Sequence, residues 1–143
     1  MCPGIQSRRD LGAVYMFDQA LEGVRVLDLT HYIAGPHCTK LMADMGADVI
    51  KVEPPGGDRF RQGRFYAPHE SRTNLPMNRS KRSIAIDLTT SEGREVVHSL
   101  TKDADVVLHN FRPGVAERLG IDYDTLSAMN PGLVYCHNTA FGP

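Results

Sequence analysis

The sequence predicts an α/β fold: an open, largely parallel sheet with helices on its faces. The first observation is the segment Val24–Glu53, which has the pattern strand, tight turn, helix, strand. The second is a further alternation of strand and helix patterns over Ser83–Cys136. Parallel strands joined through a helix form right-handed βαβ units. Ligands of such sheets bind at the carboxyl ends of the strands, here at the turn Thr30–Pro36 and near Glu53.

The first βαβ unit is predicted element by element. An apolar run over Val24–Leu29 is typical of a strand that is buried on both faces. After the turn Thr30–Gly35, Pro36 suits the first position of a helix, where a missing N–H costs nothing. Gly46 is expected to end that helix, ahead of a second strand over Asp48–Glu53. The spacing i, i+3, i+4, i+7 predicts a buried stripe made of Cys38, Leu41, Met42 and Met45.

The rest of the chain continues the same alternation. The alternating run Ser83–Leu88 predicts a third strand, and Thr89 with Glu92 fits a capping box for a helix over Glu92–Lys102. The buried face of that helix is predicted to hold Val96, Val97 and Leu100. A fourth strand is then expected at Ala104–His109, followed by a turn at Asn110–Gly114. Two helices are expected at Pro113–Gly120 and Asp122–Met129, and a fifth strand at Leu133–Cys136.

Length and composition indicate one globular domain. The chain has 143 residues, of which 41% are hydrophobic and 23% charged. Residues 1–19 lack periodicity, so we expect a disordered extension ahead of a domain over residues 20–143; Arg8 and Arg9 before Leu11–Phe17 leave an export signal as an alternative. Three widely spaced cysteines favour a reducing cytoplasm over disulfides. No apolar run approaches the roughly 18 residues of a membrane span.

A polar segment over residues 54–82 is predicted to be a long loop. From residue 59 to its end it carries seven basic side chains against one acid: Arg59, Arg61, Arg64, Arg72, Arg79, Lys81 and Arg82 against Glu70. These cations can bind phosphates, or they can pair with acids elsewhere on a solvated surface. Interleaved aromatic rings leave single-stranded nucleic acid as a third alternative. The net charge of −1 disfavours nucleic acid.

Two common kinds of site are disfavoured by their spacing. Glu53 ends a strand where an acid can bond a ribose hydroxyl, but the turn before the helix lacks the G-x-G-x-x-G glycines of a dinucleotide site. A nicotinamide or flavin cofactor is therefore not expected. A metal is not expected either, because usual structural-zinc spacing is missing from the two possible ligand groups, His31 with His37 and Cys38, and Cys136 with His137.

Four segments in order carry a family resemblance: LEGVRVLDLTHYIAGPHCTKLMADMGADVIKVEPPGGD, NRSKRSIAIDL, NFRPGVAERLGIDYDTL and NPGLVYC. From about Ala20 to Pro143 the chain resembles the amino-terminal part of the class III coenzyme A transferases, which include formyl-CoA transferase and are related to α-methylacyl-CoA racemase. The resemblance implies a Rossmann-like sheet that binds acyl-CoA and transfers CoA to a carboxylic acid acceptor. CoA is then a substrate, with no tightly bound cofactor. It also implies a much longer whole chain that forms an interlocked homodimer.

The resemblance also assigns CoA contacts to this sequence. They fall in the first turn, after the third strand, in the turn after the fourth strand and on the next helix, at Ile33, Ala34, Ile86, Asp87, Leu88, Thr89, Asn110, Phe111, Arg112 and Arg118. Ile33 can cover an adenine face, and Arg118 can meet a phosphate. Pro54 stands where some relatives carry a basic residue, which makes Arg59 and Arg61 candidates to replace that phosphate contact.

The catalytic groups of the family are expected outside this sequence. In the transferases an aspartate attacks the thioester, and in the racemases a His and an Asp exchange the α-proton. The resemblance places both sets beyond residue 143, so the chain alone is predicted to be inactive. Two alternatives stay open: a fragment of a racemase-type enzyme, and a non-catalytic CoA- or nucleotide-binding module.

Overall fold

A computed structural model describes residues 19–62, 65–67, 70–140 and 142 of the chain. Five strands form one sheet in which all four neighbouring pairs are parallel. Across the sheet the strands are β5 (Arg82–Ala85), β2 (Asp48–Glu53), β1 (Arg25–Leu29), β6 (Val106–His109) and β7 (Val134–His137). Counted in chain order, the strands of this sheet lie 3-2-1-4-5, the start of the Rossmann order. The predicted fold class is confirmed.

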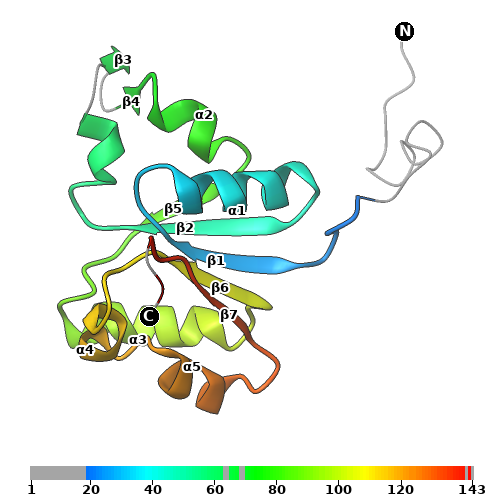
Figure 1. Cartoon of the computed structure of the whole chain (residues 1–143), viewed down its shortest axis with the longest axis vertical. Coiled ribbons are helices and arrows are strands. Elements are labelled where there is room, and N and C mark those ends of the chain that lie inside the picture. The colour runs from blue at the N-terminus through cyan, green and yellow to red at the C-terminus, as the bar shows by residue number, and fades with distance from the viewer. Residues whose placement is uncertain (1–18, 63–64, 68–69, 141, 143) are drawn as a thin grey trace, which may run out of the picture.

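Helices cover the sheet unequally (Figure 1). α1 (Ala34–Asp44) and the short α2 (Asn74–Asn78) lie on one side, and α3 (Ser91–Thr101), α4 (Val115–Leu119) and α5 (Tyr123–Met129) lie on the other. The larger core lies under α3 to α5 and contains Leu27, Leu29, Val52, Val97, Val107, Ile121 and Leu126. A smaller core under α1 contains Val26, Ala43, Ala47 and Val49. No helix among the described residues is long and apolar enough to cross a bilayer.

The segment between β2 and β5 is more ordered than the predicted loop. It contains the 3₁₀-helix η2 (Arg59–Gln62), an antiparallel pair formed by β3 (Phe65–Ala67) and β4 (Glu70–Ser71), and α2. The Ser71 hydroxyl donates to the Phe60 carbonyl and accepts the Asn74 N–H. These local bonds satisfy backbone groups that a bare loop would leave to water.

The predicted buried stripe of α1 is wrong except at Met42, which is partly buried against the smaller core. Leu41 and Met45 are 44% and 43% exposed, and Cys38 is also exposed. The helix buries its smaller and more polar face instead, at Gly35, Pro36, Thr39, Lys40 and Ala43. A hydrogen bond selects this face, because the Thr39 hydroxyl donates to the carboxylate of Asp28 at the end of β1, at 2.6 Å. α1 also begins at Ala34, two residues before the predicted first position, and Gly46 follows it with a φ of +100° as expected.

Two smaller corrections concern α3. Its N-cap is Thr90, whose hydroxyl oxygen accepts the Gly93 N–H at 3.0 Å, and not Thr89. Thr89 instead donates to Asp87 in the preceding turn. Val97 is fully buried as predicted, but Val96 is 42% exposed. The helix is therefore rotated slightly from the predicted orientation, while its type and length are confirmed.

Candidate functional site

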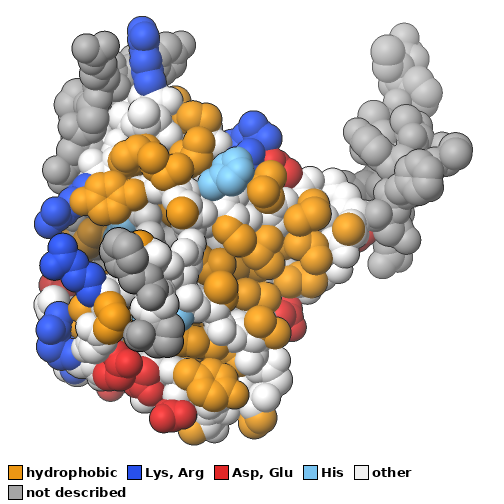
Figure 2. Space-filling model, viewed as in Figure 1, with side chains coloured by type: hydrophobic (Ala, Val, Ile, Leu, Met, Phe, Trp, Pro, Cys, Tyr) orange, Lys and Arg blue, Asp and Glu red, His pale blue; other side chains and the backbone are white. Residues whose placement is uncertain are grey.

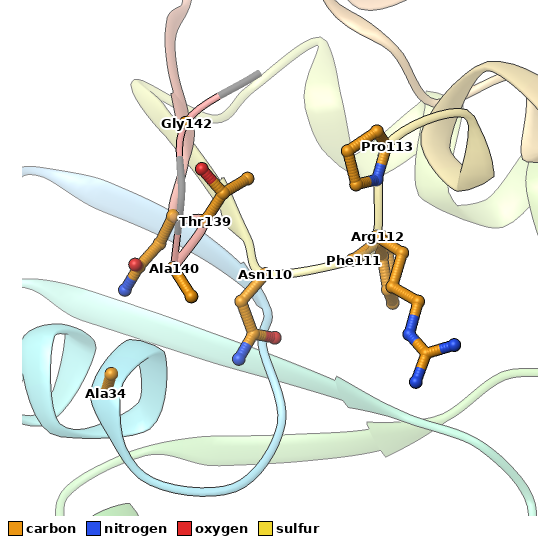
Figure 3. Close-up of a pocket in the computed structure, with 9 residues that line it drawn as sticks. Ala34, Asn110, Phe111, Arg112, Pro113, Thr139, Ala140 and Gly142 are labelled. Atoms are coloured by element: carbon orange, nitrogen blue, oxygen red, sulfur yellow. The ribbon is translucent and has the colours of Figure 1, made fainter.

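Two open cavities meet at the carboxyl edge of the sheet. One, of about 550 Å³, lies between the start of α1 and the turn after β6, and its lining includes Ala34, Asn110 and Arg112. In Figure 3 the segment that follows β7 closes its other side with Thr139 and Ala140. The other cavity, of about 530 Å³, shares the turn after β6 and extends to the first turn and the segment after β2, where its lining residues include His31, Tyr32, Gly57 and Arg59.

A third and smaller cavity, of about 160 Å³, lies between the ends of β1, β2 and β5. Its lining is mostly apolar and includes Leu29, Val52, Phe111 and the run Ile86–Thr89. Phe111 lines all three cavities, and His31 lines this one and the 530 Å³ cavity. The three cavities therefore form one continuous region around Phe111, with an apolar pocket at one end and arginine side chains at the other.

Buried charges hold the first turn, residues 30–35. The carboxylate of Asp28 is fully buried and accepts the Thr30 N–H at 2.9 Å and the Lys81 ammonium at 2.9 Å. Lys81 also donates to the Pro36 carbonyl at 2.9 Å. Burial by itself would raise the pKa of Asp28, but Lys51 and Lys81 and two hydroxyl donors lower it below the usual value. The carboxylate is therefore ionised and ties β1 to the start of α1.

Lys51 supports the same turn from β2. Its ammonium donates to the Thr30 carbonyl at 2.7 Å and lies 3.2 Å from a carboxylate oxygen of Asp58, and both charged side chains are buried.

The backbone of the first turn is strained at Tyr32, which adopts the left-handed region with a φ of +68°. That region is unfavourable for a bulky residue. A Cβ on Gly35 would lie 2.4 Å from the Thr30 side chain, so only glycine fits there. The turn is thus a strained, fixed structure.

Glu53 is unavailable to a ribose. Its carboxylate is buried and accepts bonds from the Arg61 guanidinium, the Ser83 hydroxyl and the Asp58 N–H. Burial would raise the pKa of Glu53, but these three donors lower it to about 2. The residue therefore anchors the segment after β2 and is not open to a ligand.

Most of the described cations of residues 59–82 face acids. Ion pairs join Arg61 to Glu53, Arg79 to Asp44, Lys81 to Asp28 and Arg82 to Asp48. The sequence left phosphate binding, nucleic acid binding and pairing with acids as alternatives for these cations. Pairing with acids is the alternative that holds for Arg61, Arg79, Lys81 and Arg82. Arg59 lines the 530 Å³ cavity. Arg64 lies outside the described residues.

A cluster of stacked rings holds the second turn, residues 110–114. His109 stacks on His137 with ring centres 4.2 Å apart and on Phe111 at 5.3 Å. The Phe111 N–H donates to Nδ1 of His109 at 3.3 Å, which leaves the proton of a neutral imidazole on Nε2. His109 is only 1% exposed, and burial, assisted by His137, lowers its pKa to about 4. The imidazole is therefore uncharged near neutral pH.

Asn110 joins the two turns. Its amide oxygen accepts the His31 N–H at 2.8 Å, and its amide nitrogen donates to the His31 carbonyl at 2.8 Å. A single side chain thus makes two bonds to the backbone of the first turn from the turn after β6. The side chain expected to contact CoA is occupied in this way, so Asn110 acts first as a clamp between the turns.

The structure brings together most of the residues expected at the site. Ala34, Asn110 and Arg112 line the 550 Å³ cavity, and the run Ile86–Thr89 faces Phe111 across the 160 Å³ cavity. Ile33 is 54% exposed, and neither Ile33 nor the exposed Arg118 of α4 lines these three cavities. No group of three possible metal ligands occurs among the described residues.

Sequence reasoning missed the charges that shape the site. Asp28, Lys51 and Lys81 are each buried at the side chain, and their partners lie up to 53 residues away. A signal was present, because Asp28 and Lys51 interrupt otherwise apolar strands, and a buried charge needs a partner. His109 at the end of β6 lies opposite His137 of β7 in the sheet register, so that pair follows from the strand alignment.

Comparison with known sequences decides the family. The profile of CoA-transferase family III matches residues 21–143. The chain belongs to this family. It is 46% identical to the succinyl-CoA:mesaconate CoA-transferase of Haloarcula hispanica over 86% of this chain and 32% of that protein. It is 42% identical to the formyl-CoA:oxalate CoA-transferase of Afipia carboxidovorans over 87% of this chain and 30% of that protein. This family III chain thus spans about a third of the length of these relatives.

Solved structures of the family agree with the fold. A hypothetical protein from Mycobacterium tuberculosis superimposes with a TM-score of 0.81 at 45% identity, over 87% of this chain and 34% of that one. A CAIB/BAIF family protein from Brucella suis superimposes with a TM-score of 0.80 at 40% identity, over 89% of this chain and 36% of that one. The predicted resemblance is confirmed, and it covers the amino-terminal part of the family.

Proposed function

We propose that this chain is the CoA-binding part of an acyl-CoA:carboxylate CoA transferase. The observation that carries the proposal is the convergence of three separate segments, the first turn, the run after β5 and the turn after β6, on one region around Phe111. That region joins an apolar pocket to arginine side chains, which suits a ligand with a flat base and a chain of phosphates. Acyl-CoA and a carboxylic acid acceptor are then the substrates of the whole protein.

The proposed contacts follow from where the side chains lie. The apolar cavity lined by Ile86–Thr89 and Phe111 takes the adenine, because its lining offers hydrophobic surface. Arg59 and Arg112 line the adjacent 530 Å³ cavity and meet phosphates. Ala34 and Thr139 border the 550 Å³ cavity, which leaves room for the pantetheine arm. Ile33 and Arg118 belong to the proposal because the family motifs assign them, although neither lines these three cavities. The interlocked homodimer and the cytoplasmic location belong to the same proposal.

Catalysis needs a further group. Thioester exchange requires a carboxylate that attacks the acyl carbon. The buried carboxylates Asp28, Glu53 and Asp58 are each held by cations or backbone donors, so none of the three is free to attack. We expect no CoA transfer and no epimerisation by this chain alone. An assay that supplies acyl-CoA and a panel of acids, with hydroxylamine to trap an enzyme anhydride, checks this, and a trapped adduct on one of these three residues would contradict it.

Titration calorimetry with CoA tests the binding proposal. We expect Arg112→Ala and Arg118→Ala each to weaken CoA binding roughly 10- to 100-fold, the loss of one charge-assisted bond to a phosphate. Arg82→Ala is the matched control, because Arg82 pairs with Asp48 at the opposite, amino-terminal edge of the sheet and should leave affinity unchanged. Absence of CoA binding to the unchanged chain refutes the proposal. Equal affinity for CoA and for ADP favours the nucleotide-binding module instead.

A further inference from the structure

The imidazole of His31 lies at the junction of two cavities. It lines both the apolar 160 Å³ cavity and the 530 Å³ cavity that Arg59 and Arg112 also line. Its side chain is 27% exposed, and its ring centre lies 5.8 Å from that of Phe111. Asn110 bonds both the N–H and the carbonyl of His31. The ring is therefore held at one place beside the two arginines and is accessible to a ligand.

A buried carboxylate stands behind this ring. Nδ1 of His31 lies 3.7 Å from Oδ2 of Asp58, whose side chain is fully buried. That oxygen accepts no hydrogen bond from the described residues, and a buried acceptor without a donor is unfavourable. Burial by itself would raise the pKa of Asp58, but His31, the Phe60 N–H and Lys51 lower it below the usual value. The ionised carboxylate therefore favours a proton on Nδ1 of His31 and leaves Nε2 for a ligand.

The charges around His31 leave room for one more anion. Lys51 lies 3.2 Å from Asp58 and balances its charge, whereas neither Arg59 nor Arg112 is in an ion pair within the described part of the chain. Figure 2 shows Lys and Arg side chains along the side of the molecule where α4 lies in Figure 1. A further proton on His31 adds positive charge to this region, which is unfavourable until an anion binds. The charged groups that face the ring from the neighbouring elements are the acids Asp58, Glu53 and Asp87 and the cations Lys51, Arg59 and Arg112, and Glu53 is paired with Arg61.

We propose that Nε2 of His31 donates to a phosphate group of bound CoA, and that the imidazole takes up a proton from the solvent when the ligand binds. This contact rests on the proposed CoA-binding function and adds a residue to it. In the complex the imidazolium lies between two anions, with Asp58 on its Nδ1 side and the phosphate on its Nε2 side. Each anion favours the charged ring. The affinity for CoA should therefore rise as the pH falls through the range in which histidine side chains titrate.

Titration calorimetry in buffers of different ionisation enthalpy measures the proton uptake. Dephospho-CoA is the first ligand, because its diphosphate does not titrate near neutral pH. We expect uptake of roughly half a proton near pH 7, and a loss of affinity of roughly 10-fold between about pH 6 and about pH 8. His31→Gln should remove both effects. His37→Gln is the matched control, since His37 is exposed on α1 and lines none of the three cavities, and it should change neither.

The same titrations with CoA identify the phosphate. Uptake that depends on His31 with both ligands assigns the diphosphate as its partner, and such uptake with CoA alone assigns the 3′-phosphate. Circular dichroism confirms that each variant is folded.

A second measurement separates this contact from the proposed function. Sulfate is an anion that does not titrate near neutral pH, so nitrogen-15 NMR of the histidine rings can follow His31 in the unchanged chain without CoA. Near pH 7 and at constant ionic strength, sulfate should raise the ratio of charged to neutral His31 at least ~3-fold. The same ratio for His37 should stay constant. This experiment needs no variant, so it remains decisive if His31→Gln does not fold.

Three results would overturn the contact. They are ligand binding without proton uptake, uptake that His31→Gln leaves unchanged, and sulfate that either leaves His31 unchanged or affects His37 equally. If the chain binds neither CoA nor dephospho-CoA, the proposed function fails. The sulfate result then decides by itself whether His31 belongs to an anion site.

Discussion

The carboxyl edge of the sheet is built differently on its two sides. Under the first turn, the side chains of Asp28, Lys51 and Lys81 are buried. They form ion pairs and bond directly to the backbone of Thr30 and Pro36. Under the second turn, the buried and neutral ring of His109, which stacks on Phe111 and His137, does the same work. Both sides position a turn beside the same cavities, yet one side depends on charge and the other on its absence.

The difference decides which kind of change destabilises each side. A buried ion is costly to leave without its partner, so the charged side is sensitive to the loss of a single residue. The neutral side tolerates the loss of a polar contact better, but it is sensitive to protonation, because burial of His109 disfavours the imidazolium. Substitution and pH therefore separate the two sides experimentally.

The largest effect is expected from Asp28→Ala. The substitution leaves Lys81 buried with no carboxylate and removes the acceptor of the Thr30 and Thr39 bonds. We expect a loss of about 3–5 kcal/mol in the free energy of unfolding, measured by chemical denaturation. Asp44→Ala is the control, since Asp44 pairs with the exposed Arg79 and with Lys40 near the surface and should cost much less. Equal losses for the two variants would show that burial does not set the strength of the first pair.

The next largest effect is a pH dependence that belongs to the neutral side. The folded-state pKa of His109 is lowered to about 4, below its unfolded value of 6.5. The contribution of neutral His109 to the free energy of unfolding is therefore fully present above pH 6.5. It is lost as the pH falls towards 4, by roughly 3 kcal/mol in total. His109→Phe should flatten the curve of unfolding free energy in this window, while the exposed His37→Gln should leave it unchanged.

The charged side has a lower window. The pKa of Glu53 is lowered from 4.5 to about 2, so its contribution is present above pH 4.5 and is lost as the pH falls from there towards 2. His109→Phe should leave this second decline in place. A variant that abolishes both declines would mean that the titrations of His109 and Glu53 are coupled, and the comparison would not hold.

The sequence predicted what depends on local pattern. β2 has its predicted bounds, and α5 begins and ends within one residue of its prediction, because apolar periodicity and the Asp122 cap act over a few residues. The family motifs likewise placed Ala34 and Phe111 beside cavities. These features need no knowledge of distant partners.

The sequence did not predict what depends on pairs of distant residues. The orientation of α1 follows from the bond between Thr39 and Asp28, and hydrophobicity alone favoured the opposite face. Lys51 draws its partner Asp58 from a segment that was predicted to be a loop. The site was therefore predicted as a set of backbone positions, while the charges that fix those positions emerged only from the fold.

A smaller effect tests the connection between the two sides. Asn110→Ala removes both bonds to the His31 backbone, and leaves the N–H and carbonyl of His31 to find other partners. We expect a loss of about 1–3 kcal/mol in unfolding free energy. Hydrogen exchange at the His31 amide should increase more than exchange at Val107 in the core of β6. Uniform changes across the sheet would contradict a local clamp.

The smallest effect is expected from Ser83→Ala on the charged side. The Ser83 hydroxyl donates to Glu53 at 2.9 Å, beside the stronger bonds from Arg61. Its removal should cost about 0.5–1.5 kcal/mol, the usual net value of one hydrogen bond. Because that donor favours the ionised carboxylate, the pKa of Glu53 in the folded state should rise, so the lower pH window should still begin near 4.5 but end at a higher pH. Carboxyl NMR titration measures the shift directly. An unchanged pKa would assign the whole effect to Arg61 and the Asp58 N–H, and the upper window of His109 should not move in either case.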